Sequence, residues 1–458
     1  MEQILFVSVA GIPLIILWLI IGGVFFTCRF QFINIWGVVP AIKLVQEGLG
    51  SSAQKIGISP FQALTTALSG TIGLGNIAGV AIAIQMGGIG TVFWMSLAAG
   101  LGMASKFVEC TLGQKYRVIN PDQTIAGGPM YYLSAGLADI GMAKFGKVLS
   151  IIFAIFCVGA SFGGGNMFQV NQSFVAIAFV FPGLSNYDWL FGLLVAIAVA
   201  LIIFGGIQRI GEFTSKLVPL MVGIYLVSCL WVIGSHFSQV PTAMIAIVQA
   251  AFTGSALGGG VVGILIVGVR RSAFSNGAGL GTAAIAHSAA QTDIPVKEGI
   301  IAILEPFIDT IIICNLTALV IVLTGTYGDN IASDINGAKL AALAFAQVID
   351  WYPAVLAGII VLFGFSTAIT WSYYGEKAWV YLFGDQYSFI YKLIFLSCIV
   401  LGAVIKLDLV IEFSDMMLLM MALPNIVGCI LLSNQVAKDL KNYWLQMSLK
   451  NSLETEIT

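Results

Sequence analysis

Long apolar runs separated by short polar connections dominate the chain. About 18 or more consecutive apolar residues are enough for a helix to cross a bilayer. The pattern predicts eleven membrane segments, some of them interrupted: Ile4–Phe26, Pro60–Gln85, Ile89–Tyr116, Lys147–Phe181, Leu190–Ile207, Leu217–Ile233, Gly258–Ala286, Ile300–Leu323, Ala354–Val380, Tyr391–Ile405 and Leu409–Leu432.

The polar connections are informative at three places. The stretch from Arg29 to Ile58, which contains Lys43 and Lys55, is predicted to lie on the membrane surface. The connection 325–350 is predicted to hold a short alanine-rich helix at 338–348, after the turn residues 336 and 337. Residues 1–433 are therefore predicted to form a single transmembrane domain, followed by a polar tail at 434–458.

Composition supports the membrane assignment and excludes other classes of protein. Hydrophobic residues make up 59% of the 458 residues and charged residues 9%, against about 25% charged in soluble domains. A net charge of −2 without a basic run argues against nucleic-acid binding. The seven cysteines are scattered singly, without a CxxC pair, and neither an HExxH nor a GxSxG motif occurs. We predict core-filling thiols and a protein that is not an enzyme.

The positions of Lys and Arg predict the orientation. Lys339 and Lys406 fall on one side of the eleven segments, Arg270 and Arg271 lie within a segment, and all the other basic residues fall on the opposite side. Basic residues concentrate on the cytoplasmic side. A multi-pass protein of the cytoplasmic membrane is predicted, with the N-terminus outside and the C-terminus inside.

An internal repeat indicates inverted halves. Residues 69–76 (SGTIGLGN) align without gaps to residues 275–282 (SNGAGLGT), and both copies lie inside apolar segments that are five segments apart. An offset of an odd number of membrane segments inverts the second copy relative to the first, an arrangement found in secondary transporters. The predicted repeats are 59–236 and 240–433.

The glycine-rich copies are predicted to be breaks in membrane helices. Backbone groups that a break frees at membrane depth need a partner, so a break lines a cavity. Freed amides of Gly73, Leu74 and Gly75 would suit a carboxylate, and freed carbonyls of residues 70–72 would suit sodium. The alternative is close helix packing through small residues.

The motifs TTALSGTIGLGNIAGVA, GGIGTVFWMSLAAGLGMASKFVE, GGPMYYL, RRSAFSNGAGLGTA and EPFIDT resemble the alanine or glycine:cation symporter family. The resemblance implies an all-α polytopic fold like that of the bacterial leucine transporter, with two inverted five-helix repeats, broken helices at the midplane and one extra N-terminal helix. It also implies uptake of small amino acids driven by sodium or protons. Gly277 departs from the expected Ser-Asn-Glu-Ala-Gly pattern, which affects the predicted ion preference and substrate selectivity.

The two breaks supply the first candidate ligands. Asn76 is predicted to bind sodium through its amide oxygen together with Thr71, or else to cap a helix. Ser275 is predicted to contact the same ion and Asn276 the substrate. Phe274 would form a wall of the substrate pocket, although a buried phenylalanine is more often only part of the core.

Two other segments contribute candidates. Gln169 shares a helix face with Gly165 and is predicted to bond the substrate, or else another helix. By analogy with the leucine transporter, a second sodium site would use hydroxyl groups of the ninth segment, although such hydroxyls also bond their own helix. Trp371 follows them and would limit the pocket to small side chains. The hydroxyl candidates are Ser366, Thr367 and Thr370.

The buried charges are predicted to form ion pairs. Glu305 and Asp309 lie four residues apart in the eighth segment, and we expect Arg270 and Arg271 to pair with them and fix a gate; direct cation coordination by the two acids is the alternative. Lys106 and Glu109 are predicted to form a local pair.

These features together predict a secondary transporter in the lipid bilayer that imports alanine or glycine with sodium. The alternatives are the same fold with a larger substrate such as glutamine, the same fold coupled to protons, and, as a different class, an ion channel. A channel is disfavoured because a ring of repeated carbonyl loops is missing.

Overall fold

The computed structural model describes residues 8–9, 11–48, 57–253, 260–328 and 337–457. Nearly all of these residues are helical. The strands are limited to two antiparallel pairs, β1 (Ser8–Val9) with β2 (Ile12–Pro13) and β3 (Val118–Ile119) with β4 (Ile125–Ala126). The prediction of an all-helical polytopic membrane protein is confirmed.

The N-terminal part of the chain contains one apolar helix and a short surface segment. These are α2 (Leu14–Arg29), α3 (Ile33–Trp36) and α4 (Val38–Gly48). On α3 and α4 the side chains of Ile35, Val39 and Ile42 are exposed. Lys55 and residues 4–7 of the first predicted segment lie outside the described residues.

The first half of the chain continues through two interrupted helices and several continuous ones. The elements are α5 (Pro60–Thr71), η1 (Gly75–Gly79), α6 (Val80–Gly87), α7 (Thr91–Lys115), α8 (Pro129–Tyr131), η2 (Tyr132–Gly136), α9 (Leu137–Asp139), α10 (Ala143–Phe162), η3 (Gly163–Met167), α11 (Phe168–Val180), η4 (Pro182–Leu184), α12 (Asp188–Ile203) and α13 (Gly206–Ser235). Ser59 starts α5 with a capping box to Gln62, and Pro60 occupies its first turn, where a missing N–H costs little.

The second half contains the remaining helices. The elements are η5 (Phe237–Gln239), α14 (Val240–Thr253), α15 (Gly260–Asn276), α16 (Ala283–His287), α17 (Pro295–Ala302), α18 (Leu304–Pro306), η6 (Phe307–Cys314), α19 (Asn315–Leu323), α20 (Gly337–Ala346), α21 (Tyr352–Phe383), η7 (Asp385–Tyr387), α22 (Ser388–Val404) and α23 (Leu407–Ile457). The predicted short helix at 338–348 is α20, whereas α14 was not predicted.

All eleven predicted segments coincide with helices, but not all of these helices are long. Among the described residues, seven helices are long and apolar enough to cross a membrane, or eight when α5 and the η1–α6 helix count as one bent span. The other three predicted segments correspond to α2, to α12 and to the interrupted pair α15 and α16. Shorter helices need tilt, partners or a thinner local bilayer to span.

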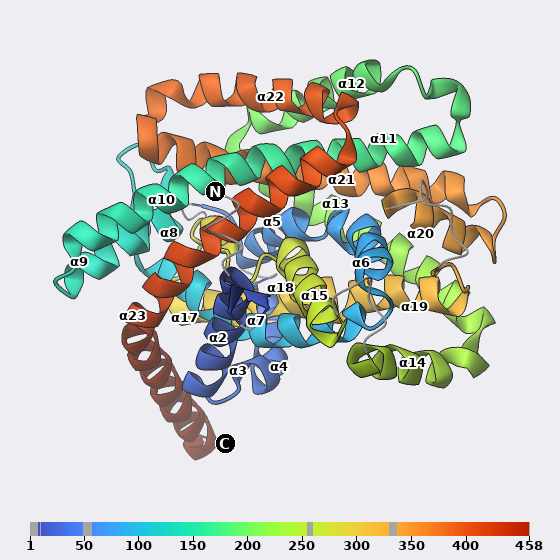
Figure 1. The fold of residues 1–458 in the computed structure, drawn as a ribbon. Coiled ribbons are helices and arrows are strands. Elements are labelled where there is room, and N and C mark those ends of the chain that lie inside the picture. The colour runs from blue at the N-terminus through green and yellow to red at the C-terminus, as the bar shows by residue number, and fades with distance from the viewer. Residues whose placement is uncertain (1–7, 10, 49–56, 254–259, 329–336, 458) are drawn as a thin grey trace.

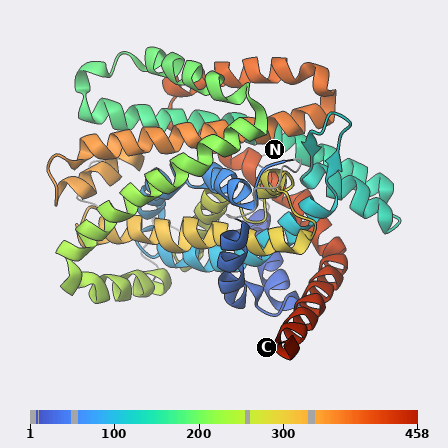
Figure 2. The ribbon, with the colours of Figure 1, turned by 180° about the vertical axis from the view of Figure 1, so that it is seen from behind.

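The long helices cross one another in a compact bundle (Figure 1). Helices α10, α11 and α21 pack along one another, and α12 lies beside α22 at the edge seen at the top of the view. Helix α23 runs diagonally across this bundle, and its C-terminal end projects beyond the other helices in both views (Figure 2). The predicted polar tail from Asn434 is therefore a continuation of α23 rather than a separate element.

Both predicted breaks are present. Helix α5 ends at Thr71, and the axis bends by 48° before the chain becomes helical again at Gly75. The second break follows Asn276, where Gly277, Gly279 and Gly281 adopt φ of +63°, +81° and +83°. This left-handed region is open to glycine at low cost and is unfavourable for other residues. The glycines thus end α15 and allow the extended turn before α16.

Candidate functional site

The backbone groups freed by the first break are bonded by side chains. The amide of Gly73 donates to Asn76 Oδ1 at 3.0 Å, and the amide of Leu74 donates to Gln169 Oε1 at 3.0 Å. Because a buried N–H without an acceptor is costly, these two bonds stabilise the bend. In this conformation, the predicted carboxylate donors Gly73 and Leu74 are already occupied by protein side chains.

The carbonyl groups of the break are bonded from α21. Thr367 Oγ1 donates to the Ser69 carbonyl at 2.9 Å, and Trp371 Nε1 donates to the Gly70 carbonyl at 2.8 Å. Ser366 contributes a hydroxyl contact with Ser69 Oγ at 2.6 Å. Three of the predicted residues on α21 therefore lie against the first break, as the one-turn spacing suggested.

Thr370 also lies on this face but has a different environment. Its hydroxyl is buried and, among the described residues, has no hydrogen-bond partner. A Cβ placed on Gly70 would lie 3.0 Å from the Thr370 methyl group and 3.2 Å from the Tyr374 hydroxyl, which is also without a described partner. The Tyr374 hydroxyl therefore lies beside the break, whereas Thr370 turns its methyl group toward Gly70.

Asp309 brings the two breaks together. Its carboxylate accepts hydrogen bonds from Asn76 Nδ2 at 2.6 Å and from Ser275 Oγ at 2.8 Å. Thr310 Oγ1 donates to the same carboxylate at 2.6 Å, and Asn76 Nδ2 also reaches the Asp309 carbonyl at 3.0 Å. All four residues are buried. A carboxylate, an amide and hydroxyls form the oxygen-rich environment that a hard cation prefers.

The expected pairing of Glu305 and Asp309 with Arg270 and Arg271 is wrong. Both arginines pair with Asp415 on α23, with Arg270 Nε 2.7 Å from the carboxylate and Arg271 also in direct contact. The sequence offered no signal for this pairing because Asp415 is more than 140 residues away along the chain. Asp309 is consequently left to the hydroxyl and amide donors.

The aromatic residues of the site pack against glycine. A Cβ on Gly165 would clash with the Trp371 indole, and a Cβ on Gly164 would lie 3.5 Å from the Phe274 ring. Phe274 also stacks edge to face on Phe168, with ring centroids 4.9 Å apart. The glycines of η3 thus make room for two large rings.

Three further predicted residues make contacts at or near the two breaks. Asn276 donates to Ser272 and Thr310, and its oxygen accepts from the Ala278 amide at 2.9 Å, so its side chain serves the second break. Thr71 bonds the carbonyls of its own helix at 3.3 Å. Gly75 lies close to the second break, where an added Cβ would sit 3.2 Å from the Cα of Ser275.

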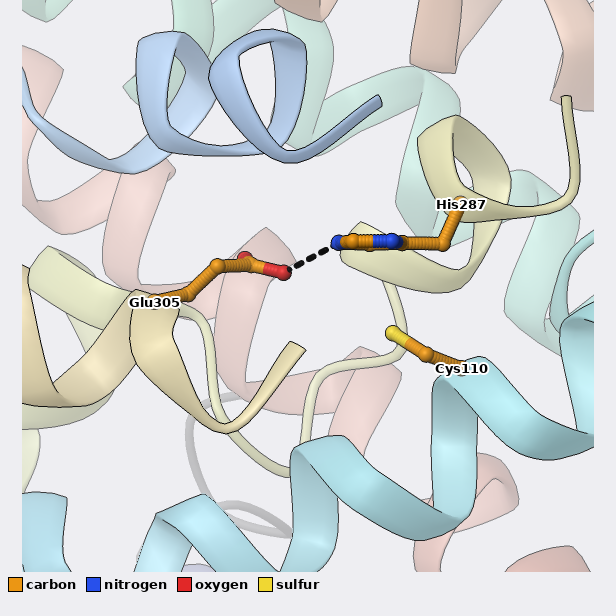
Figure 3. Close-up of side chains that lie close together, drawn as sticks. All are labelled: Cys110, His287 and Glu305. Atoms are coloured by element: carbon orange, nitrogen blue, oxygen red, sulfur yellow. Dashed lines mark hydrogen bonds and ion pairs between the residues drawn. The ribbon is translucent and has the colours of Figure 1, made fainter. Parts of the chain in front are cut away.

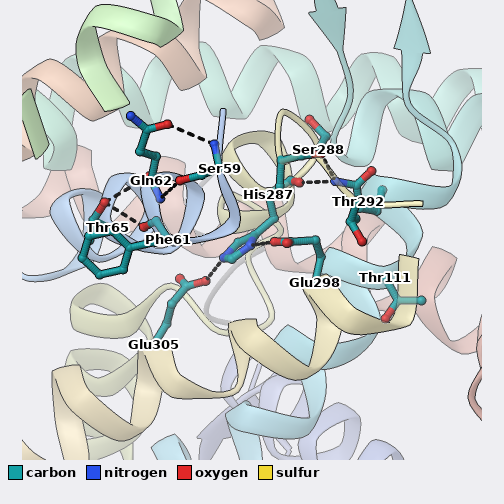
Figure 4. A network of polar contacts seen from close by, with 12 residues as sticks. Ser59, Phe61, Gln62, Thr65, Thr111, His287, Ser288, Thr292, Glu298 and Glu305 are labelled. Atoms are coloured by element: carbon teal, nitrogen blue, oxygen red, sulfur yellow. Dashed lines mark hydrogen bonds and ion pairs between the residues drawn. The ribbon is translucent and has the colours of Figure 1, made fainter. Parts of the chain in front are cut away.

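A second buried polar cluster lies next to the breaks. His287 Nε2 is 2.8 Å from Glu305, and Cys110 lies beside both residues (Figure 3). The other ring nitrogen is 2.7 Å from Glu298 (Figure 4). Lys106 pairs with Glu305 at 3.0 Å, so the expected local pair of Lys106 with Glu109 is wrong. Residues on α7 and α18 are distant in sequence, and only the fold brings them together.

Comparison with known proteins points to a single family. The family model described as the sodium:alanine symporter family matches residues 3–457. The sodium/alanine symporter AgcS of Methanococcus maripaludis is 38% identical over 435 residues, which cover 94% of each chain. The probable sodium/glutamine symporter GlnT of Bacillus subtilis is 35% identical, covering 97% of this chain and 92% of the relative.

A solved structure has the same fold. The crystal structure of MhsT in complex with L-phenylalanine superimposes with a TM-score of 0.57, covering 83% of this chain and 90% of that chain. Sequence identity across this match is 12%, so the likeness concerns the arrangement of the helices.

Proposed function

Because the chain belongs to the sodium:alanine symporter family, and is thus a membrane transporter and not an enzyme, we propose that it imports small neutral amino acids together with sodium. Alanine and glycine are the proposed substrates. Sodium is transported cargo in this proposal and not a resident cofactor.

The main observation that supports this proposal is the environment of Asp309. Its carboxylate meets Asn76 from the first break and Ser275 from the second, at 2.6 Å and 2.8 Å. In the proposed mechanism, sodium binds to oxygens of this group after the Asn76 amide rotates its oxygen toward the ion. Ion binding would then change contacts on both broken helices at once, which is how a cation can favour one arrangement of the two halves.

A second sodium site is proposed beside the first break on α21. The Thr370 hydroxyl is buried without a described partner, and Thr367 already reaches the Ser69 carbonyl at 2.9 Å. Ser366 completes the row of hydroxyls along this helix face. Neutral hydroxyl and carbonyl oxygens fit sodium better than they fit a transition metal.

A small substrate fits the aromatic packing. The Trp371 indole fills the space over Gly165, and Phe274 lies against Gly164. Bound alanine would interact with the backbone of Gly73, Leu74 and Gly75 through its carboxylate, with Gln169 turning from Leu74 to the substrate. Glutamine is the second candidate substrate, because a relative of similar identity is named as a probable sodium/glutamine symporter.

The membrane topology is part of the proposal. We infer two inverted repeats at 59–236 and 240–433, insertion in the cytoplasmic membrane, an outer N-terminus and a cytoplasmic C-terminal end of α23. The argument remains the concentration of Lys and Arg on one side of the segments. Asn276 is proposed to act on the substrate indirectly, through the geometry of the second break.

Uptake of labelled alanine into proteoliposomes tests the proposal. With an inward sodium gradient, alanine should accumulate above its equilibrium level, and unlabelled glycine should compete better than glutamine. A proton gradient in sodium-free buffer should not support accumulation. Accumulation driven by protons alone would overturn sodium coupling, preferential competition by glutamine would overturn the small-substrate assignment, and alanine flux without accumulation would indicate a channel.

A further inference from the structure

The buried cluster around His287 is separate from the residues proposed to bind sodium and alanine. Four charged or titratable side chains from four elements meet there: Lys106 of α7, His287 of α16, Glu298 of α17 and Glu305 of α18. Each has no solvent-exposed side-chain surface. Groups of this kind are costly inside a membrane protein and are retained where they carry out a function.

The hydrogen-bond geometry requires protons in the cluster. Both ring nitrogens of His287 face carboxylates, at 2.7 Å from Glu298 and 2.8 Å from Glu305. A carboxylate is only an acceptor, and a neutral imidazole has one donor nitrogen. Either His287 is doubly protonated or one of the two glutamates carries a proton. In both cases the cluster holds one proton more than a neutral histidine between two ionised glutamates.

Unpartnered carboxylate oxygens favour a further proton. Glu109 lies on the same side of α7 as Lys106, one turn further along, and bonds Asn425 at 2.7 Å. With Glu298 and Glu305 it makes three carboxylates, whereas the buried cations are Lys106 and, when protonated, His287. Among the described residues, Glu298 Oε1 and Glu109 Oε2 are buried without a hydrogen-bond partner. An unpartnered anionic oxygen in a low-dielectric interior gains from protonation.

Other titratable groups lie around His287. They are Cys110 on α7, Tyr374 on α21 and Arg117 after α7, whose guanidinium donates to the carbonyls of Ser288, Ala290 and Thr292. Arg117 also places a positive charge near Glu298, so the unpartnered carboxylate oxygens, rather than an excess of negative charge, favour the further proton. Cys110, His287 and Glu305 could also hold a metal ion. The ammonium group of Lys106 lies 3.0 Å from Glu305. Its positive charge disfavours a metal ion at the position between Cys110, His287 and Glu305.

We propose that the Glu298–His287–Glu305–Lys106 cluster is a proton-binding site, separate from the sodium site at Asp309, and that its protonation sets the transport rate. The step is reversible proton transfer between water and the Glu298 carboxylate, with no electron transfer.

The cluster is placed to act on the breaks. His287 is the last residue of α16, which follows the second break. The chain just after it pairs with Ile58, two residues before α5 begins: the Ile58 amide donates to the Ala289 carbonyl at 3.0 Å. Rearranging the two broken helices therefore moves His287 relative to α7 and α17. Protonation of Glu298 replaces an ionic contact with His287 by a weaker neutral one. We therefore expect the contacts of the protonated cluster to break faster when the two broken helices rearrange.

The test compares pH profiles of sodium-driven alanine uptake and therefore rests on the proposed function. The buffer has equal pH on both sides of the vesicle membrane and saturating sodium, so that neither a proton gradient nor loss of sodium binding contributes. Uptake by the parent chain should be roughly threefold or more faster at about pH 6 than at about pH 9, the range over which a histidine–carboxylate cluster can titrate.

Glu298→Gln mimics the protonated state and should be fast at both pH values, with alanine affinity unchanged. Glu212→Gln, at an exposed glutamate of α13, is the matched control and should keep the parent profile. If Glu298→Gln does not fold, Glu298→Asp should show a displaced midpoint. A flat parent profile, an unchanged profile in Glu298→Gln or an undisplaced midpoint in Glu298→Asp overturns the proton site. Absence of alanine accumulation at every pH would instead overturn the proposed function.

Discussion

Asn76 donates a 2.6 Å hydrogen bond to the carboxylate of Asp309, and through it the first broken helix contacts η6. The two residues are 233 positions apart and both are buried. Asn76 uses its oxygen at the same time to accept from the Gly73 amide at 3.0 Å, so one side chain holds the bend and reaches the carboxylate. Asn76 thus makes the capping contact of the helix-capping alternative, and the proposed ion role requires its oxygen to turn away from the Gly73 amide.

Asp309→Asn should weaken sodium dependence. The substitution keeps the size of the side chain but removes the charge next to the proposed ion. We expect the sodium concentration for half-maximal alanine uptake to rise by roughly tenfold, equivalent to about 1.4 kcal/mol. Asp122→Asn, at an exposed aspartate, is the control. Unchanged sodium dependence in folded Asp309→Asn would remove this carboxylate from the ion site.

Gln169→Ala should weaken alanine binding and destabilise the first break. The Leu74 amide would lose its acceptor, at a cost of about 1 to 3 kcal/mol for a buried donor. Gln169→Glu retains an acceptor for Leu74 but loses the bond from Gln169 Nε2 to the Gly164 carbonyl at 2.8 Å, so it should be the milder change in stability. Thermal unfolding measures the stability of the variants, and calorimetric titration measures their affinity for alanine. Equal effects of Gln169→Ala and Gln169→Glu would argue against a role of Gln169 as the acceptor for the Leu74 amide.

Trp371 should limit the size of the substrate. In Trp371→Leu, loss of the indole opens space over Gly165, and leucine or methionine should begin to compete with labelled alanine. Discrimination by pocket volume is worth roughly 1 to 3 kcal/mol per methylene, so acceptance should be partial. Alanine itself should bind more weakly because the bond from Nε1 to the Gly70 carbonyl is also lost.

Gly165→Ala provides a matched variant for the same contact. Its methyl group would clash with Cγ and Cβ of Trp371, so the single variant should be destabilised, and adding Trp371→Leu should not restore stability because leucine keeps both of these carbons. Overpacking of a buried contact typically costs about 1 to 3 kcal/mol. An inhibition profile that is unchanged in well-expressed Trp371→Leu would mean that Phe274 or the glycines of η3 determine the size limit.

The two arginines that share Asp415 should differ in their contribution to stability. The Arg271 side chain is 1% exposed and that of Arg270 is 22% exposed. Removing one partner of a buried ion pair costs about 3 to 5 kcal/mol, so Arg271→Gln should lower the free energy of unfolding by that order. Arg270→Gln should cost about 1 kcal/mol or less, closer to a surface pair. Comparable losses on denaturation in mild detergent would contradict this ranking.

Gly277, which departs from the family pattern, lies next to a buried cation. Its φ is +63°, and a Cβ at this position would lie 3.7 Å from Lys106 Nζ. An acidic side chain, as expected from the family pattern, would therefore lie next to the ammonium group that here pairs with Glu305. The sequence showed that a carboxylate is missing, but only the fold shows which cation it would have faced.

The local pattern of the sequence was sufficient for the eleven predicted segments and the two breaks, although not for α14. Apolar runs and glycine clusters act over a few residues, because a segment in lipid must bond its own backbone and glycine weakens a helix where it stands. For the same reason Thr367 and Trp371, one turn apart on α21, were correctly placed on a common face. Their partners on α5 were proposed from the breaks and from the family resemblance.

The tertiary structure decided how buried charges are paired. Arg271 contacts Asp415 instead of Glu305, Lys106 contacts Glu305 instead of Glu109, and Asp309 receives hydroxyl and amide donors from both breaks. A sequence does not reveal which acidic residue pairs with which basic residue, because the strength of the attraction depends on the distance between the charges and on their burial. Those two quantities are fixed only when helices distant in the chain pack against one another.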